Sequence, residues 1–454
     1  MADEYDVIVI GAGTVCEGVA KALEGSGQSL AVIERELVGG ECPYWGCIPS
    51  KTLLRSAEVL AEAQRARHLG AARVEVDVDF AAIARRTHEI SGDEDDTAAT
   101  RSLEKQGATV IRGEGRLTGP ATVEVGDRRL TARRGIVIGT GTSAAIPPID
   151  GLDGLEYWTN RQATLARELP TSLLVLGSGP IGAELAQAFA RFGTRVHVVE
   201  ALDRLLPAEE PEASAELAEA FEADGIAVSL SATAVAASQS AQGITLRLES
   251  GESLAAERLL VAVGRRPNLA GIDLGAAGIS TTEKGWIKVD GATLVAAPGI
   301  WAGGDITGIG AFTHLSWYHG LVIGRQLRGE EARADHRAIP RVTFTNPEVA
   351  SVGLSEASAR ARLADVRVVG ADSGNGTRGY IHGPPGGVIK LVADMDRRIL
   401  VGALVVGPRA GEMIAELTLA IRAEIPLAVL EDTLHAFPTF SRDFDGLFPQ
   451  LVDH

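Results

Sequence analysis

The chain has 454 residues, of which 45% are hydrophobic, and a net charge of −17. Chains of this length exceed one hydrophobic core and usually split into roughly two to four domains. The acidic balance argues against a nucleic-acid partner and against docking on an anionic membrane, because both need clustered Lys and Arg. No apolar run approaches the roughly 20 residues of a membrane-spanning helix, and we do not expect the acidic N-terminus to act as a signal peptide. We therefore expect a soluble, cytoplasmic protein with no nucleic-acid or membrane partner.

A strand, a glycine turn, a helix and a second strand are predicted in succession over residues 5–34. In the turn, Gly11 permits the tight bend, and Gly13 lets the backbone approach a pyrophosphate at the amide-rich helix N-terminus. Glu34 ends the second strand, where an acidic residue accepts hydrogen bonds from a ribose diol. Cys16 stands where a third Gly or Ala belongs, and we expect it to be buried in packing rather than reactive.

Cys42 and Cys47 are separated by four residues and precede a helix predicted over residues 49–67. The partial positive charge at a helix N-terminus favours the thiolate of Cys47. Lys51 lies in the same helix, where its positive charge stabilises nearby anionic groups. Three cysteines in all, without paired histidines, make a poor zinc site, and we predict no metal. From these residues alone, a redox pair and a structural or metal-binding pair both remain open.

The next predicted elements are a charged helical region over residues 79–106 and a strand over residues 135–141. The helical region carries so many charges that one face is expected to be solvated. The strand runs into a second glycine turn, which contains Thr140 and Gly141.

A second strand–turn–helix–strand unit begins at residue 173. Its turn holds Gly177, Gly179 and Gly182, and Glu200 ends its second strand at the same offset as in the first unit. One such motif is a weak signal, but two in matching context predict two dinucleotide-binding domains. A carboxylate at Glu200 binds a free 2′-hydroxyl and repels a 2′-phosphate, which favours NADH over NADPH.

From about Arg341 the pattern changes to strands, Gly/Pro turns and an amphipathic helix near residues 410–422. We place a third, α+β domain there. The predicted fold class is therefore α/β, with two Rossmann-like domains followed by an α+β domain.

Residues 39–51 resemble the active-site motif of the pyridine nucleotide–disulfide oxidoreductases, the class I flavoenzyme family of lipoamide dehydrogenase, glutathione reductase and mercuric reductase. Further segments are similar to motifs of this family and follow in the same order: 139–141, 264–268, 302–305 and 344–353. The resemblance implies an FAD-binding domain (1–150 and 284–335), an NAD-binding domain (151–283) and a dimer-interface domain (336–454). It also implies a homodimer.

The resemblance further implies roles for individual residues. Cys47 would be the thiol beside the flavin and Cys42 the interchange thiol that faces substrate. Lys51 and Glu184 would form an ion pair near the flavin. Hydride would pass from NADH to FAD and the electrons on to the Cys42–Cys47 disulfide. The residues expected to bind the cofactors are Gly11, Gly13, Glu34, Gly40, Lys51, Thr140, Gly141, Gly177, Gly179, Gly182, Glu200, Gly264 and Asp305.

The sequence departs from the family near its C-terminus. Phe437 stands where the family has its acid/base His, and Arg442 stands where a Glu orients that His. His435 matches an earlier, non-catalytic His. Disulfide interchange needs a proton donor and a base, typically worth about 10²–10⁴ in rate. Either His435, Tyr318 or His319 substitutes for the missing group, or the substrate is not an ordinary dithiol.

We predict an NADH-dependent FAD oxidoreductase that passes electrons through Cys42 and Cys47 to a small-molecule disulfide or another acceptor. The alternatives are an NADH:quinone or metal-ion reductase, or carbanion chemistry like that of 2-ketopropyl coenzyme M oxidoreductase/carboxylase, a relative that also has Phe at the acid/base position. A redox-sensing binding protein with slow turnover is a third class.

Overall fold

The computed structural model describes residues 3–383 and 386–452. The chain folds into two compact units, each assembled from three stretches. The first unit comprises Met1–Pro49, His88–Ala145 and Arg265–Asp335, and the second comprises Ser50–Thr87, Ile146–Gly264 and His336–His454. Relative to the predicted domains, residues 50–87 and 146–150 group with the second unit and residues 265–283 with the first. The division into three functional domains stays a prediction.

A mainly parallel sheet forms the centre of the first unit. Its core is β1 (Asp3–Ile10), which pairs in parallel with β2 (Leu30–Glu34) on one side and with β6 (Arg128–Ile138) on the other. The full order is β16-β17-β6-β1-β2-β3, with β5 paired to β6 and β4 paired to β5. The remaining bounds are β3 Ala108–Arg112, β4 Gly115–Gly119, β5 Thr122–Val125, β16 Val295–Ala297 and β17 Ile300–Ala302. The continuous apolar runs of β1 and β2 are buried on both faces, as parallel strands require.

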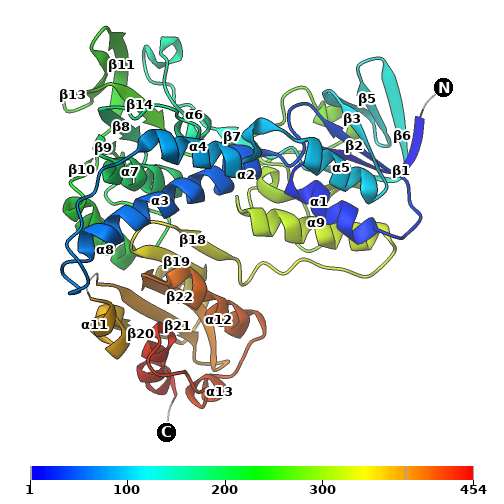
Figure 1. Ribbon diagram of the computed structural model, residues 1–454. Helices are drawn as coiled ribbons and strands as arrows, with labels where there is room; N and C mark the ends of the chain where they lie inside the picture. Colours follow the sequence, from blue (N-terminus) through cyan, green and yellow to red (C-terminus); the bar gives the residue numbers. More distant parts are fainter. Residues whose placement is uncertain (1–2, 384–385, 453–454) are drawn as a thin grey trace. The chain divides into compact units, whose positions relative to one another are not determined.

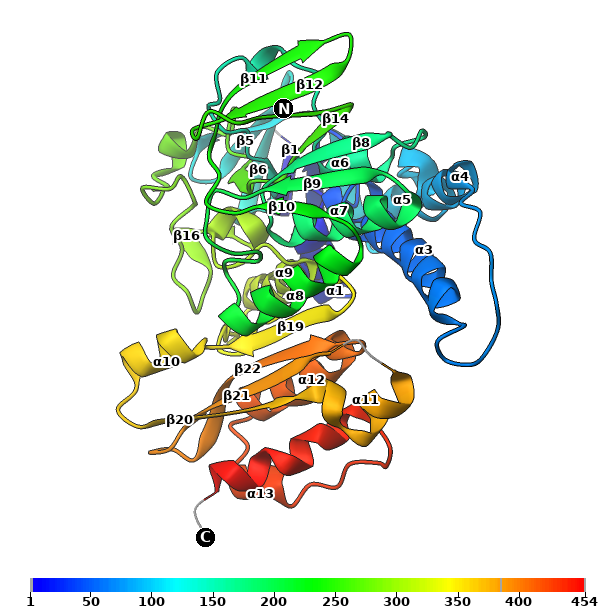
Figure 2. The ribbon, with the colours of Figure 1, turned by 90° about the vertical axis from the view of Figure 1, so that its left-hand side faces the viewer.

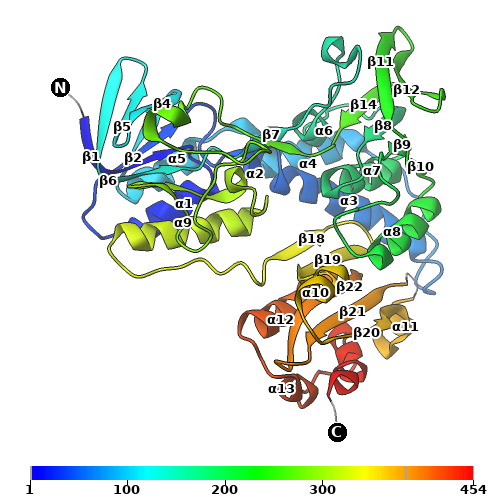
Figure 3. The same cartoon turned by 180° about the vertical axis from the view of Figure 1, so that it is seen from behind.

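Two helices cover one face of this sheet, and they approach each other very closely. Figures 1 and 3 show α1 (Thr14–Leu23) and α9 (Thr313–Leu327) side by side. A Cβ on Gly18 would lie 2.6 Å from the Trp317 carbonyl oxygen, and one on Gly320 would lie 2.3 Å from that of Val15. The absence of side chains at these glycines therefore permits the close helix–helix contact.

The predicted helical region 79–106 is interrupted in the structure. It consists of α4 (Phe80–Ile90) and α5 (Thr97–Lys105), separated by a short 3-10 turn. Asp93 and Glu94 in that turn have positive φ angles of 48° and 62°. Together with Gly92, they end the helix because left-handed residues cannot continue it.

The second unit contains the other nucleotide fold. A parallel sheet of order β10-β9-β8-β14 is flanked by α7 (Pro180–Phe192) and α8 (Pro211–Ala223). Its strands are β8 Ser172–Leu176, β9 Arg195–Val199, β10 Ala227–Ser229 and β14 Arg258–Val261. The short helix α6 (Asn160–Thr164) and a three-stranded antiparallel sheet complete this fold: β11 Ala234–Ser240, β12 Gly243–Leu248 and β13 Ser253–Ala256.

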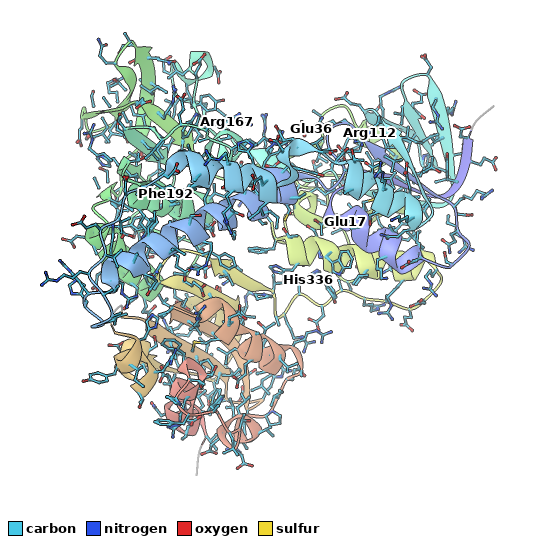
Figure 4. The ribbon with its side chains drawn as sticks, viewed as in Figure 1. Glu17, Glu36, Arg112, Arg167, Phe192 and His336 are labelled. Carbon is cyan, nitrogen blue, oxygen red and sulfur yellow. The ribbon has the colours of Figure 1, made fainter. Side chains whose placement is uncertain are left out.

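Helices α3 and α4 contribute to the core of the second unit. The predicted helix 49–67 is α3 (Cys47–Arg65), which begins at the second cysteine of the pair. In α4, the Phe80 ring lies 6.2 Å from that of Phe189 and 5.6 Å from that of Phe192. Figure 4 labels Phe192 among the helices of this core.

The C-terminal part is an α+β arrangement, as predicted. An antiparallel sheet has the order β18-β19-β22-β21-β20, and helix α12 (Ala410–Arg422) coincides with the predicted amphipathic helix. Figure 2 shows α8 on one side of this sheet and α12 on the other. Alternate strand residues accordingly face two cores, with Val349 toward the nucleotide fold and Ala350 toward α12. The remaining bounds are β18 Pro340–Thr343, β19 Glu348–Gly353, β20 Val366–Asp372, β21 Val388–Asp394, β22 Ile399–Gly407, α10 Glu356–Arg362, α11 Thr377–His382 and α13 Leu427–Glu431.

Within residues 3–383 and 386–452, no helix combines the length and the apolar character that a membrane crossing requires.

Candidate functional site

The first glycines of the two predicted turns have the same geometry. Gly11 has φ +96°, and a Cβ there would lie 2.5 Å from the Gly139 carbonyl oxygen. Gly177 has φ +99°, and its Cβ would lie 2.6 Å from the carbonyl oxygen of Ala262. No other residue type fits either position without moving the neighbouring strand.

The second glycines face open space. An added Cβ on Gly13 or Gly179 would meet no atom within 4 Å. Each glycine immediately precedes a helix, α1 or α7, whose free N–H groups attract an anion. Both turns therefore offer the room and the polarity that a pyrophosphate needs.

The third position differs between the turns. A Cβ on Gly182 would lie 2.0 Å from the Gly177 carbonyl oxygen, so only glycine fits there. The equivalent Cys16 is fully buried among apolar side chains of the first unit. Burial raises the pKa of its thiol. The expectation that Cys16 serves packing is confirmed.

The two acidic residues after the second strands bind their own glycine turns. Glu34 accepts hydrogen bonds from the backbone N–H groups of Ala12 and Glu36, both at 2.7 Å. Glu200 accepts an equivalent bond from Ser178 N–H at 2.8 Å and another from the Ser178 hydroxyl at 2.7 Å. Each carboxylate has about four lone-pair sites, so acceptor capacity remains for a ribose diol.

Arg112, at the end of β3, stabilises the chain that follows β2. Its guanidinium donates to the Glu36 carbonyl oxygen at 3.1 Å and pairs with Asp96 at 2.7 Å. Figure 4 shows Glu36 and Arg112 close together at this edge of the sheet. Asp96 in turn accepts from Val38 N–H. These bonds therefore fix the position of the chain just before the cysteine segment.

The glycine turn after β6 carries a buried polar atom that has no partner among the described residues. This atom is the Thr140 hydroxyl oxygen. Two residues on, the hydroxyl of Thr142 donates to the carboxylate of Asp305 at 2.8 Å. Burial raises the pKa of Asp305. An orphaned hydroxyl and a buried carboxylate fit a polyhydroxylated ligand such as the ribityl chain and phosphates of FAD.

Two residues that our sequence reasoning did not select hold this turn in place. Arg265 donates to the Thr142 hydroxyl at 2.9 Å and to its carbonyl oxygen at 2.6 Å. Asn268 donates its side-chain amide to the Thr140 carbonyl oxygen at 3.1 Å. Both lie in the segment 264–268, of which only Gly264 (φ +135°) had been selected as cofactor-binding. The sequence motif 264–268 was the signal that could have indicated these two residues. In the structure, strand β15 (Arg265–Pro267) pairs with β7 (Thr142–Ala144), which brings the motif against this turn.

The cysteine pair lies in the first unit, on either side of a tight turn: Cys42 is in α2 (Glu41–Tyr44) and Cys47 is the first residue of α3. Gly40, which precedes it, has φ +71° and lies against Gly13, which places the turn beside the pyrophosphate position. A Cβ on Gly46 would lie 3.3 Å from the Cys42 Cα, so glycine lets the turn fold back.

Both cysteines are half-buried thiols. The side chains of Cys42 and Cys47 hydrogen-bond to each other, and this bond, together with burial, raises the pKa of Cys42. Cys47 Sγ lies 3.3 Å from the Thr313 hydroxyl, at the first residue of α9. Cys47 is thus at the N-terminus of α3 and beside that of α9, and both helix ends favour its thiolate.

The second unit contains the predicted ion pair. Lys51 Nζ lies 2.7 Å from Glu184 Oε2, and the Glu184 side chain is almost fully buried. Phe344 N–H donates to the other carboxylate oxygen at 2.9 Å, and its ring centroid lies 5.0 Å from Lys51 Nζ. The pairing of these residues is confirmed, whereas their placement beside a flavin stays a prediction.

His435 is held between two carboxylates. Its Nε2 lies 2.9 Å from Glu416 and its Nδ1 lies 2.5 Å from Asp445. Burial lowers the pKa of His435, but the hydrogen bonds to Glu416 and Asp445 outweigh burial and raise it. With both ring nitrogens engaged, this geometry favours a structural role over proton transfer.

Phe437 and Arg442 lie together on the surface of the chain. The Arg442 guanidinium stacks over the Phe437 ring at 5.0 Å, and Phe437 is 65% exposed. The other suggested substitutes are engaged elsewhere: the Tyr318 hydroxyl accepts from Asp335 N–H at 2.8 Å, and the buried His319 Nδ1 accepts from Gly304 N–H at 3.0 Å.

Comparison with known proteins shows the family of the chain. Residues 5–320 match the pyridine nucleotide-disulphide oxidoreductase family, and residues 339–447 match the dimerisation domain of that family. The dihydrolipoyl dehydrogenase of Chlorobaculum tepidum is 35% identical over 97% of this chain and 96% of its own length. The mercuric reductase of Streptomyces lividans is 34% identical over 96% of this chain and 94% of its own length.

Two solved structures superimpose on nearly the whole chain. The HOCl-induced flavoprotein disulfide reductase RclA from Escherichia coli superimposes with a TM-score of 0.86 at 28% identity, covering 98% of this chain and 99% of that one. LpdA from Mycobacterium tuberculosis superimposes with a TM-score of 0.88 at 25% identity, covering both chains in full. The two nucleotide turns, the cysteine pair and these matches together show that the chain belongs to the pyridine nucleotide-disulphide oxidoreductase family of FAD-dependent flavoenzymes.

Proposed function

We propose that the protein transfers the electron pair of NADH, by way of FAD, to a Cys42–Cys47 disulfide, and that the resulting dithiol reduces a small disulfide. The observation that carries this proposal is the pair itself. Two half-buried thiols that hydrogen-bond to each other lie on the turn that follows an FAD-type glycine motif. Apart from a redox relay, such an arrangement has little use in a flavoenzyme.

FAD, when bound, would supply two-electron chemistry: it would take hydride from NADH and pass the electron pair to the disulfide, giving NAD⁺, one thiol and one thiolate. The residues of the chain position the cofactor and control the protonation of the two thiols. Thr140 and Asp305 would hold the hydroxyl groups of the cofactor. Cys47, at two helix N-termini, keeps the thiolate, whereas Cys42, whose pKa is raised, carries the proton. Once deprotonated, Cys42 attacks the substrate disulfide, which forms a mixed disulfide and releases one substrate thiol. Cys47 then attacks Cys42 of the mixed disulfide, which releases the second substrate thiol and restores the Cys42–Cys47 disulfide.

The nicotinamide cofactor is NADH in preference to NADPH. Glu200 is buried and its carboxylate is fixed by Ser178 at the end of β9. A carboxylate held there accepts hydrogen bonds from a 2′-hydroxyl and repels a 2′-phosphate.

Lys51 and Glu184 position the flavin in this proposal. Lys51 follows Cys47 by four residues in α3, and Glu184 fixes its ammonium group. A fixed ammonium stabilises negative charge that develops on a nearby ring during hydride transfer.

The active form is a homodimer in which each chain presents Phe437 and Arg442 to its partner's dithiol. Exposed apolar side chains in the C-terminal part support an interface there: Leu419, Val429, Leu434 and Phe437. Phenylalanine neither gives nor takes a proton, so turnover with ordinary disulfides lacks the roughly 10²–10⁴-fold contribution of a general acid/base.

The test compares Cys42→Ser with the native enzyme, using NADH with lipoamide and NADH with a soluble quinone. We expect Cys42→Ser to reduce lipoamide turnover at least about a hundredfold while FAD binding persists. Unchanged lipoamide turnover would exclude the dithiol relay. If quinone turnover is faster than lipoamide turnover and survives in Cys42→Ser, the flavin alone serves a quinone acceptor and the proposal of a disulfide substrate fails.

A further inference from the structure

A cavity of 600 Å³ opens at one end of the C-terminal sheet. Its walls come from the segment before β18, the end of β19, the start of β22 and the residues that follow α12. Figure 4 labels His336, the first of the lining residues along the chain. Cavities of about 300–1,000 Å³ are typical of small-molecule sites. None of the chemistry proposed above uses this one.

The cavity is strongly cationic in a chain whose net charge is −17. Four arginines line it, with a single carboxylate: Arg337, Arg341, Arg362, Arg397 and Glu424. Arg341 is balanced by Glu209, which lies outside the lining and accepts two of its hydrogen bonds at 3.0 and 3.3 Å. Glu424 is the single carboxylate that lines the cavity together with the other three arginines.

Glu424 links two of these arginines. The same carboxylate oxygen accepts from Arg337 and, at 2.5 Å, from Arg397. Glu424 has φ +50° just after α12 ends, a conformation that favours glycine. A glutamate in this strained position orients two guanidinium groups toward the same space. Because the three side chains are about half exposed, their ion pairs are weak enough for another anion to join them.

Arg362 adds a further charge. It is exposed at the end of α10 and has no ion-pair or hydrogen-bond partner for its guanidinium among residues 3–383 and 386–452. A guanidinium presents two parallel N–H donors that match a carboxylate or phosphate.

Apart from His336 and Gly353, the rest of the wall is apolar. It consists of aliphatic side chains that are buried or half-buried: Ile339, Leu354, Leu363, Ile399, Leu400, Val401 and Ile421. A hydrated inorganic ion gains nothing from such a wall, whereas an organic anion buries its carbon skeleton against it.

We propose that this cavity binds a small organic anion. Arg337, Arg362 and Arg397 hold its carboxylate, sulfonate or phosphate group, and the aliphatic wall holds its apolar part. Glu424 orients the arginines and weakens binding by its own charge. The site is separate from the redox chemistry, so its test does not depend on that function.

The probe is 8-anilinonaphthalene-1-sulfonate, whose fluorescence rises in an apolar site, added to the FAD-loaded protein. N-phenyl-1-naphthylamine is the matched neutral probe. We expect saturable binding of one sulfonate probe per chain, and at least tenfold weaker binding of the neutral one. Arg362→Ala and Arg397→Ala should each weaken sulfonate binding about tenfold, the loss of one charge-assisted hydrogen bond.

Two further variants make the result decisive. Glu424→Gln should tighten sulfonate binding severalfold, because it removes the competing carboxylate; a purely structural role predicts weaker binding. Arg360→Ala is the matched control for Arg362→Ala. Arg360 lies on the same helix, α10, but pairs with Glu356 outside the cavity. Equal affinities for all variants, equal binding of the two probes, or no saturable binding would overturn the proposal. Unchanged FAD content and Tm show that each variant is folded.

Discussion

Replacing Thr140 by Val tests whether the turn after β6 is built for a cofactor. The Thr140 hydroxyl oxygen is buried and has no hydrogen-bond partner among the described residues. Valine has nearly the same shape, so the substitution removes the hydroxyl with little change in packing. The effect on stability should then have opposite signs with and without FAD.

The magnitude follows from the cost of the unpaired hydroxyl. A buried polar group without a partner costs about 1–3 kcal/mol, and the hydrogen bond it makes when satisfied contributes about 0.5–1.5 kcal/mol. Thr140→Val should therefore stabilise the apoprotein by about 1 kcal/mol, after allowance for imperfect isosterism. FAD binding should weaken by about 2 kcal/mol, or roughly thirtyfold, because the variant loses both the bond and the relief of the unpaired hydroxyl.

The assay is urea unfolding of the apoprotein, paired with fluorescence titration of FAD. Thr140→Ser is the control, because it keeps the hydroxyl and should bind FAD nearly normally. If the apoprotein of Thr140→Val loses stability while its FAD affinity is unchanged, the hydroxyl serves the fold rather than the cofactor, and our reasoning about the turn is wrong.

Further predictions concern other parts of the chain. His435 has a raised pKa, so its stabilising effect is complete below about pH 6.5 and is lost as pH rises through its folded pKa. The difference in unfolding free energy between the native protein and His435→Asn, measured by urea unfolding, should therefore shrink between pH 6 and pH 9. A constant difference would contradict the ion-pair assignment. Glu200→Ala should reduce the kcat/KM preference for NADH over NADPH about tenfold or more. In the reduced native protein, Ellman's reagent should titrate the redox pair but not Cys16, which should react only after unfolding; three rapid thiols would contradict its burial. The double variant Phe437→His with Arg442→Glu should raise lipoamide turnover, by up to about a hundredfold, and no change would show that these residues do not reach the dithiol.

The nucleotide turns could be predicted from sequence because their constraints are local. Gly11 and Gly177 are required by their own φ angles and by the adjacent strand, and Glu34 and Glu200 lie at the strand ends that bring them back to those turns. Hydrophobic periodicity likewise predicted α12, whose apolar face packs on one sheet.

Other features depend on contacts between distant parts of the chain. The predicted helix 79–106 is broken at Glu94, whose carboxylate accepts from the Trp45 indole N–H at 2.8 Å, and no local pattern shows that bond. Arg265 binds Thr142 across more than a hundred residues. The two carboxylates that hold His435 lie ten and nineteen residues away, on separate elements. Only the folded chain reveals these partners.

The central claim is that electrons pass through the Cys42–Cys47 pair. The most direct test is to reduce the FAD-loaded protein anaerobically with one equivalent of NADH, record the long-wavelength absorbance of a thiolate beside oxidised flavin, and count the thiols that become alkylated. We predict that this absorbance appears, that two additional thiols per chain are alkylated, and that Cys42→Ser gains none on NADH addition. If NADH instead bleaches the flavin completely and the thiol count does not change, the electrons stop at the flavin and the proposed relay is wrong.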